Sequence, residues 1–124
     1  IETLVIDEIS MANADLMDGI DRALRQASGR RAEPFGGVQI VMFGDPYQLA
    51  PVPPRGDEMR YIRDHYRSFW FFDAKVWTGE VAGDGLMELG AYGASLHVRE
   101  LAEIHRQADP AVKRLAEAIR TGEE

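Results

Sequence analysis

The chain has 124 residues, 45% of them hydrophobic, and 14 Lys and Arg against 21 Asp and Glu give it a net charge of −7. This length suits one domain or part of one, and the composition is that of a folded globular protein rather than a disordered or fibrous one. The chain has no cysteine, which excludes a disulfide framework, a cysteine zinc site and a thiol nucleophile, and its acidity argues against a general nucleic-acid-binding surface over this segment.

The first half of the chain predicts a βαβ unit. Residues 4–6 form a short apolar run typical of a buried strand, residues 14–27 have helical spacing with Asn13 as a candidate N-cap, and residues 38–43 form a second apolar strand. A strand, a helix and a strand within about 40 residues imply parallel strands joined by a right-handed crossover. Because Ile1 stands directly before the first strand, we expect further sequence upstream.

The second half is more varied. A proline-rich loop at residues 51–56 precedes a short predicted helix at residues 57–66 and an aromatic cluster at residues 69–77, for which core packing is favoured over stacking with nucleic-acid bases. After a glycine-rich stretch, residues 96–104 are a candidate third strand. Residues 110–119 predict a last helix with Asp109 as N-cap and Gly122 as C-cap.

Polar residues follow both predicted strands of the βαβ unit, where ligands of open parallel sheets bind. Asp7 and Glu8 follow the first strand; a carboxylate there can hold Mg²⁺, and the next one can face a water that attacks a terminal phosphate. Taken alone, this pair is better explained as acidic residues near the N-terminus of the following helix. After the second strand, Gln48 can donate to a phosphate oxygen, although residues 44–52 suit a proline-rich turn with Asp45 as a cap equally well.

A third candidate is Arg106, which follows the predicted third strand. A guanidinium at a sheet edge can bind a phosphate through two hydrogen bonds and stabilise charge in a transition state. The alternative is a surface arginine paired with Asp109 or Glu103.

Together these segments resemble the superfamily 1B DNA helicases of the PIF and RecD type, which are P-loop NTPases. Residues 7–11 (DEISM) resemble helicase motif II, or Walker B; residues 44–52 (GDPYQLAPV) resemble motif III; and residues 101–109, containing HRQAD, resemble the motif IV region. The resemblance implies an α/β fold, a partial RecA-like domain with a parallel sheet in a three-layer α/β/α arrangement. Residues 1–124 would be the C-terminal part of the first RecA-like motor domain.

The family implies an ATP-driven motor that moves along single-stranded DNA and separates duplexes. Carried over, Asp7 would bind Mg²⁺, Glu8 would be the catalytic base and contact Mg²⁺ through water, and Gln48 and Arg106 would contact the γ-phosphate of ATP. Asp45, Tyr47 and Gln48 would couple the nucleotide to DNA. The implied partners are single-stranded DNA and the remainder of the helicase chain, and the implied cofactors are ATP and Mg²⁺.

The sequence departs from the family pattern because it has no Walker A loop: neither Lys75 nor Lys113 follows a glycine. We therefore expect the isolated chain to be inactive as an ATPase and the longer parent protein to be active. An incomplete sheet also exposes a strand edge, so the isolated chain is expected to dimerise or aggregate.

Other contexts fit the same motifs. A degenerate NTPase-like protein-interaction module and the ATPase segment of a relaxase–helicase or an exonuclease subunit remain alternatives. No apolar run approaches the roughly 18 residues of a membrane span, and no charged leader precedes the first strand. We expect a cytoplasmic protein with no membrane partner.

Overall fold

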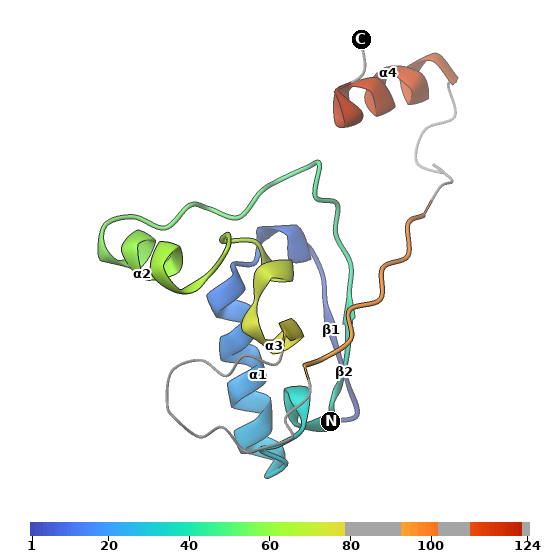
Figure 1. Ribbon diagram of the computed structural model, residues 1–124. Coiled ribbons are helices and arrows are strands. Elements are labelled where there is room, and N and C mark those ends of the chain that lie inside the picture. The colour runs from blue at the N-terminus through green and yellow to red at the C-terminus, as the bar shows by residue number, and fades with distance from the viewer. Residues whose placement is uncertain (79–92, 102–109, 123–124) are drawn as a thin grey trace.

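The computed structural model describes residues 1–78, 93–101 and 110–122 (Figure 1). Its strands are β1 (Thr3–Ile6) and β2 (Gln39–Met42), and its α-helices are α1 (Ala14–Ser28), α2 (Asp57–His65), α3 (Lys75–Thr78) and α4 (Pro110–Thr121). Three short 3-10 helices, η1 (Ile9–Met11), η2 (Pro34–Gly37) and η3 (Phe71–Asp73), lie between them. Within the described ranges, no helix is both long and apolar enough to cross a membrane.

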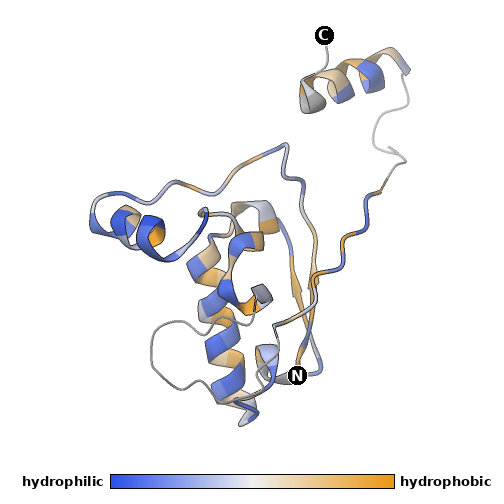
Figure 2. Ribbon diagram, in the orientation of Figure 1, coloured by the Kyte–Doolittle hydropathy of each residue, from blue (hydrophilic) through white to orange (hydrophobic). Residues whose placement is uncertain are grey.

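The predicted βαβ unit is confirmed. Strands β1 and β2 pair in parallel, with Thr3 opposite Gln39 and Ile6 opposite Met42, and α1 connects them. Both strands are hydrophobic (Figure 2) because the face that carries Ile6, Ile40 and Met42 packs against the core. The fold class is therefore α/β with a parallel sheet. The second helical layer of a three-layer arrangement does not appear among the described residues, and Val5 is 58% exposed.

Helix α1 is the element on which the rest of the core assembles. Its apolar side chains recur at helical spacing, and Met17 is fully buried, which stabilises the fold by about 2 kcal/mol. The helix ends at Gly29, whose φ of 73° is the left-handed conformation that favours glycine. The buried core consists of Ile9, Ala14, Met17, Phe35, Ile62, Tyr66, Ala74 and Val76.

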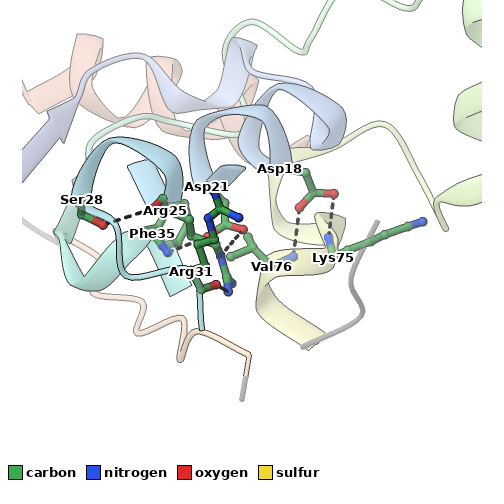
Figure 3. A network of polar contacts seen from close by, with 8 residues as sticks. All are labelled: Asp18, Asp21, Arg25, Ser28, Arg31, Phe35, Lys75 and Val76. Atoms are coloured by element: carbon green, nitrogen blue, oxygen red, sulfur yellow. Dashed lines mark hydrogen bonds and ion pairs between the residues drawn. The ribbon is translucent and has the colours of Figure 1, made fainter. Parts of the chain in front are cut away.

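Two carboxylates on α1, Asp18 and Asp21, accept hydrogen bonds from the backbone of neighbouring segments (Figure 3). Asp21 binds Arg25 at 2.8 Å and accepts a hydrogen bond from the backbone N–H of Phe35 at 2.5 Å. Arg25 in turn donates to the carbonyl of Arg31 at 2.9 Å. These bonds hold the loop that leads from α1 to β2, and thereby the position at which β2 enters the sheet.

The aromatic cluster packs mainly as predicted. Phe69, Phe71 and Trp77 contact the core, and Trp70 forms an isolated antiparallel bridge with Asn13 at the start of α1. Phe72 is different because it is 44% exposed and stacks on Trp70 with ring centroids 5.6 Å apart. Residues 69–77 therefore contribute side chains both to the core and to the protein surface near the start of α1.

One local prediction was confirmed only in part, and another was wrong. Asn13 occupies the N-cap position of α1 with an extended backbone, but its side chain makes no capping hydrogen bond in the described structure. The predicted strand at residues 96–104 is not a strand over 96–101, and residues 102–104 lie outside the described ranges. Val98 and Leu101 are 78% and 86% exposed, and the described sheet contains only β1 and β2, so residues 96–101 pair with no strand among the described residues.

The last predicted helix is confirmed as α4, and Gly122 follows it with a φ of 72°, as expected of a C-cap glycine. Its proposed N-cap, Asp109, lies outside the described residues. In Figure 1, α4 stands apart from the βαβ unit. Its apolar side chains Val112, Leu115 and Ile119 are accordingly 43%, 62% and 74% exposed.

Candidate functional site

The parallel sheet brings together the two segments that follow its strands at their carboxyl ends, residues 7–8 after β1 and residues 44–48 after β2, called here the first and second polar segments. Directly beyond the paired residues Ile6 and Met42, the N–H of Phe43 donates to the carbonyl of Ile6 at 2.9 Å. The N–H of Ile9 donates back to the carbonyl of Phe43 at 2.9 Å. Residues 7 and 8 are thus enclosed between two hydrogen bonds to the second strand, and the predicted meeting of the two strand ends is confirmed.

Gly44 makes this approach possible. A β-carbon at position 44 would lie 3.0 Å from Cγ2 of Ile9 and 3.1 Å from the backbone nitrogens of Ile9 and Ser10. Two of these neighbours are backbone atoms, which cannot move aside easily. Ser10 itself is 1% exposed, and its hydroxyl has no hydrogen-bond partner among the described residues. The first turn after Glu8 is therefore packed tightly against the start of the second polar segment.

Asp7 and Glu8 are both exposed at the tip of β1. Oδ1 of Asp7 accepts a hydrogen bond from the N–H of Glu8 at 2.9 Å, and Glu8 has a left-handed backbone with φ 52° and ψ 41°. A non-glycine residue in this conformation is strained by about 1–2 kcal/mol. Glu8 is the N-cap of η1, just after the end of β1, and its side chain is exposed there.

The donor set fits a magnesium ion only if a substrate supplies further ligands. Within the described ranges, no group of three His, Cys, Asp or Glu residues can hold a metal ion. Mg²⁺ in nucleotide sites is bound through one or two carboxylates together with water and substrate phosphates. Asp7 and Glu8 meet that smaller requirement because both carboxylates are exposed next to each other.

The second segment forms a tight turn centred on Asp45. The N–H of Tyr47 donates to Oδ1 of Asp45 at 3.0 Å, and the N–H of Gln48 donates to the Asp45 carbonyl at 3.1 Å. The side-chain amide of Gln48 donates from Nε2 to Oδ2 of Asp45 at 3.2 Å. Asp45 therefore organises the whole turn, which agrees with the alternative prediction of a proline-rich turn that Asp45 caps.

Apolar side chains within the turn and after it are exposed to solvent. Tyr47, Leu49 and Val52 are 59%, 64% and 72% exposed, whereas Pro51 between them is buried. Pro51 fixes the loop to the protein, and its neighbours remain available for contact. Arg106, the third predicted phosphate contact, lies outside the described residues, so the structure does not test its position.

Asp18, a buried carboxylate on α1, was not predicted from the sequence. Asp18 is 6% exposed and accepts hydrogen bonds from the Tyr66 hydroxyl at 2.8 Å, the Val76 N–H at 2.9 Å and the Lys75 N–H at 3.2 Å. Burial and the bond to Asp18 raise the pKa of Tyr66 above its ordinary value. The helical spacing of the sequence could have indicated that Asp18 is buried, because it falls on the inward face of α1 with Ala14 and Met17.

The chain is similar to known DNA helicases. Residues 1–78 match the family model of PIF1-like helicases. The chain is 52% identical over 54 residues, 44% of its length, to the ATP-dependent DNA helicase PIF5 of Trypanosoma brucei brucei, and covers 6% of that protein. It is 33% identical over 121 residues, 98% of its length, to mouse ATP-dependent DNA helicase PIF1, and covers 15% of it.

A solved structure is similar over nearly the whole chain. The crystal structure of Pif1 helicase from Bacteroides in complex with ADP-AlF3 and single-stranded DNA aligns with a TM-score of 0.80 and 40% identity. The alignment covers 98% of this chain and 24% of the Bacteroides chain. The chain thus spans a small part of the relatives that it matches.

Proposed function

The chain belongs to the PIF1-like helicase family, and we propose on this basis that it is part of an ATP-driven motor that moves along single-stranded DNA and separates duplexes. The observation that carries the proposal is the joining of the two polar segments at the sheet edge, where the Ile9 N–H donates to the Phe43 carbonyl at 2.9 Å. Asp7 and Glu8, which we propose to act on the nucleotide, are thereby connected through the backbone to residues 44–52, which carry exposed apolar side chains.

The proposed roles are those that the family resemblance implies, and the exposure of Asp7, Glu8 and Gln48 is compatible with them. Asp7 holds Mg²⁺ together with nucleotide phosphates, and a bound Mg²⁺ neutralises charge on the phosphate oxygens. Glu8, at the same open edge, accepts the proton of the attacking water. Gln48 contacts the γ-phosphate, and Tyr47 faces the DNA side of the turn. Arg106 is proposed as a second γ-phosphate contact from the sequence resemblance alone.

We place the chain in the first RecA-like motor domain, as its C-terminal part. The family match covers residues 1–78, which also hold the whole βαβ unit, so this stretch supports the assignment most directly. The remaining phosphate contacts, including a Walker A loop, would come from sequence outside this chain. An ATPase assay of the 124-residue chain by itself is therefore expected to show no hydrolysis.

The proposal is tested with Glu8→Gln in the full-length protein that contains this chain. The change removes the base and keeps the size of the side chain, so DNA-stimulated ATP hydrolysis should be lost while nucleotide binding is kept. Glu58→Gln is the matched control, because Glu58 is exposed in the first turn of α2. Hydrolysis at the wild-type rate by the Glu8→Gln variant, or no DNA-stimulated hydrolysis by the wild type, would refute the proposed function.

We also propose that the separate chain associates with itself through its sheet. The described sheet has two strands, so each strand leaves one edge unpaired in the described structure. Unpaired edges with apolar strands tend to pair with a second chain. Sedimentation of the 124-residue chain over a range of concentrations tests this, and a monomer at all concentrations would contradict it.

A further inference from the structure

The carboxylate of Asp45 uses both of its oxygens within the turn that it begins. Oδ1 accepts from the backbone N–H of Tyr47, and Oδ2 accepts from Nε2 of Gln48. The first bond shapes the backbone of the turn. The second bond holds the side chain of Gln48, the residue that we propose contacts the nucleotide.

A carboxylate can only accept hydrogen bonds, whereas an amide has one end that donates and one that accepts. Asp45 therefore binds the NH₂ end of Gln48 and excludes the flipped amide, in which two acceptors would face each other. With one N–H held by Asp45, the Gln48 amide retains a second N–H and its carbonyl for other partners. An N–H can donate to a phosphate oxygen, and a carbonyl can accept from a water.

We propose that Asp45 is a positioning residue that fixes which end of the Gln48 amide faces the nucleotide and the attacking water. This inference rests on the proposed function and deepens it. It gives a physical form to the coupling of nucleotide to DNA expected for Asp45, which would act through Gln48 rather than through a contact with DNA, since a carboxylate repels the phosphate backbone. Tyr47, whose N–H is held by the same carboxylate, keeps its exposed position on the outer side of the turn.

Two substitutions distinguish the roles of the two carboxylate oxygens of Asp45. Asp45→Ser keeps an acceptor for the Tyr47 N–H, because serine forms the same kind of turn, but it has no second oxygen for Gln48. Asp45→Asn keeps both positions and turns one acceptor into a donor. The Gln48 amide then satisfies this donor by flipping, so its carbonyl turns toward residue 45 and away from the site.

The experiment measures ATP hydrolysis and ADP binding by the full-length protein, with and without a single-stranded oligonucleotide. Asp45→Asn is expected to lower the DNA-stimulated kcat about tenfold, a change of the size that one lost transition-state hydrogen bond produces. Its Kd for ADP should stay within about twofold of the wild type, because ADP lacks the γ-phosphate that Gln48 is proposed to contact. Asp45→Ser should fall between the wild type and Asp45→Asn, since Gln48 is then unrestrained rather than reversed.

Asp57→Asn is the matched control, because its side chain is 93% exposed and pairs with Arg60 on the surface of α2. A kcat of Asp45→Asn equal to that of this control would overturn the inference. So would a loss of activity that follows a lower melting temperature and is the same for the Asn and Ser variants, since that would indicate a purely structural role.

The two proposals fail in distinguishable ways. If the wild type is active, Glu8→Gln is inactive and Asp45→Asn behaves as the wild type, only the role of Asp45 is wrong. If the wild type shows no DNA-stimulated hydrolysis, the proposed function is wrong and the role of Asp45 falls with it.

Discussion

The α-carbon of Gly44 lies so close to Ile9 that a β-carbon at position 44 would come within 3.1 Å of the Ile9 backbone nitrogen. This contact joins the turn after β1 to the turn after β2. Because Ile9 follows Glu8 directly, any displacement of residue 44 is transmitted to the backbone that orients the proposed catalytic base. The close approach therefore ties the geometry of one segment to that of the other.

Gly44→Ala should therefore destabilise the protein and reduce its activity. The added methyl group meets backbone atoms of Ile9 and Ser10, and overpacking of this kind costs about 1–3 kcal/mol. Gly19→Ala is the matched control: no atom lies within 4 Å of its added β-carbon, and alanine favours the interior of α1 by about 0.5–1 kcal/mol. Thermal unfolding measures both, and a Gly44→Ala variant as stable as the wild type would contradict the close contact.

Asp18→Ala should be among the more destabilising single changes in the core. It removes the acceptor of three hydrogen bonds, from Tyr66, Lys75 and Val76, and leaves their donors buried without a partner. The expected loss is about 3 kcal/mol in the free energy of unfolding. Tyr66→Phe removes one donor and keeps the other two bonds, so its expected loss is about 1 kcal/mol. Chemical denaturation measures both, and equal stabilities of the two variants would show that Asp18 acts through Tyr66 alone.

The raised pKa of Tyr66 predicts a loss of stability in strongly alkaline solution. The folded state holds the phenolic proton more tightly than the unfolded state, in which the pKa is near 10.0. The resulting stabilisation is fully present below pH 10 and declines as the pH rises above it. Tyr66→Phe should show a smaller decline over the same range. Unfolding curves at several alkaline pH values test this, and an identical pH dependence in both proteins would contradict it.

The sequence was sufficient to predict the βαβ unit and the meeting of its two polar segments. Both strands are short apolar runs, the helix between them has regular spacing, and parallel strands place their carboxyl ends at one edge. These are local patterns and one general rule of topology. The position of Glu8 beside the start of the second segment needed nothing further.

Features that depend on contacts between distant residues were not predictable in this way. Residues 96–101 include the apolar residues Leu96, Val98 and Leu101, but a strand also needs a paired neighbour, and the sheet of the described residues contains only β1 and β2. Asn13 is a suitable N-cap by type, yet its backbone pairs with Trp70 and its side-chain oxygen is buried without a partner in the described structure. The role of Asp45 toward Gln48 likewise depends on the turn geometry rather than on spacing alone.

The left-handed backbone of Glu8 is the clearest case, since glutamate has no preference for it. The conformation is imposed by the Asp7 carboxylate on one side and by the bond from Ile9 to Phe43 on the other. A residue that is kept in a strained conformation at a proposed active site predicts a conflict between stability and activity.

Glu8→Gly and Glu8→Ala test this conflict, because both remove the carboxylate and only glycine relieves the strain. Both variants should lose DNA-stimulated ATP hydrolysis in the full-length protein. Glu8→Gly should be more stable than Glu8→Ala by about 1 kcal/mol, since alanine at a φ of 52° keeps its β-carbon close to the following carbonyl oxygen. Denaturant unfolding of the two variants measures the difference. A glycine variant that is no more stable than the alanine variant would show that the backbone at Glu8 stores no strain, and its conformation would then have no stability cost for the fold.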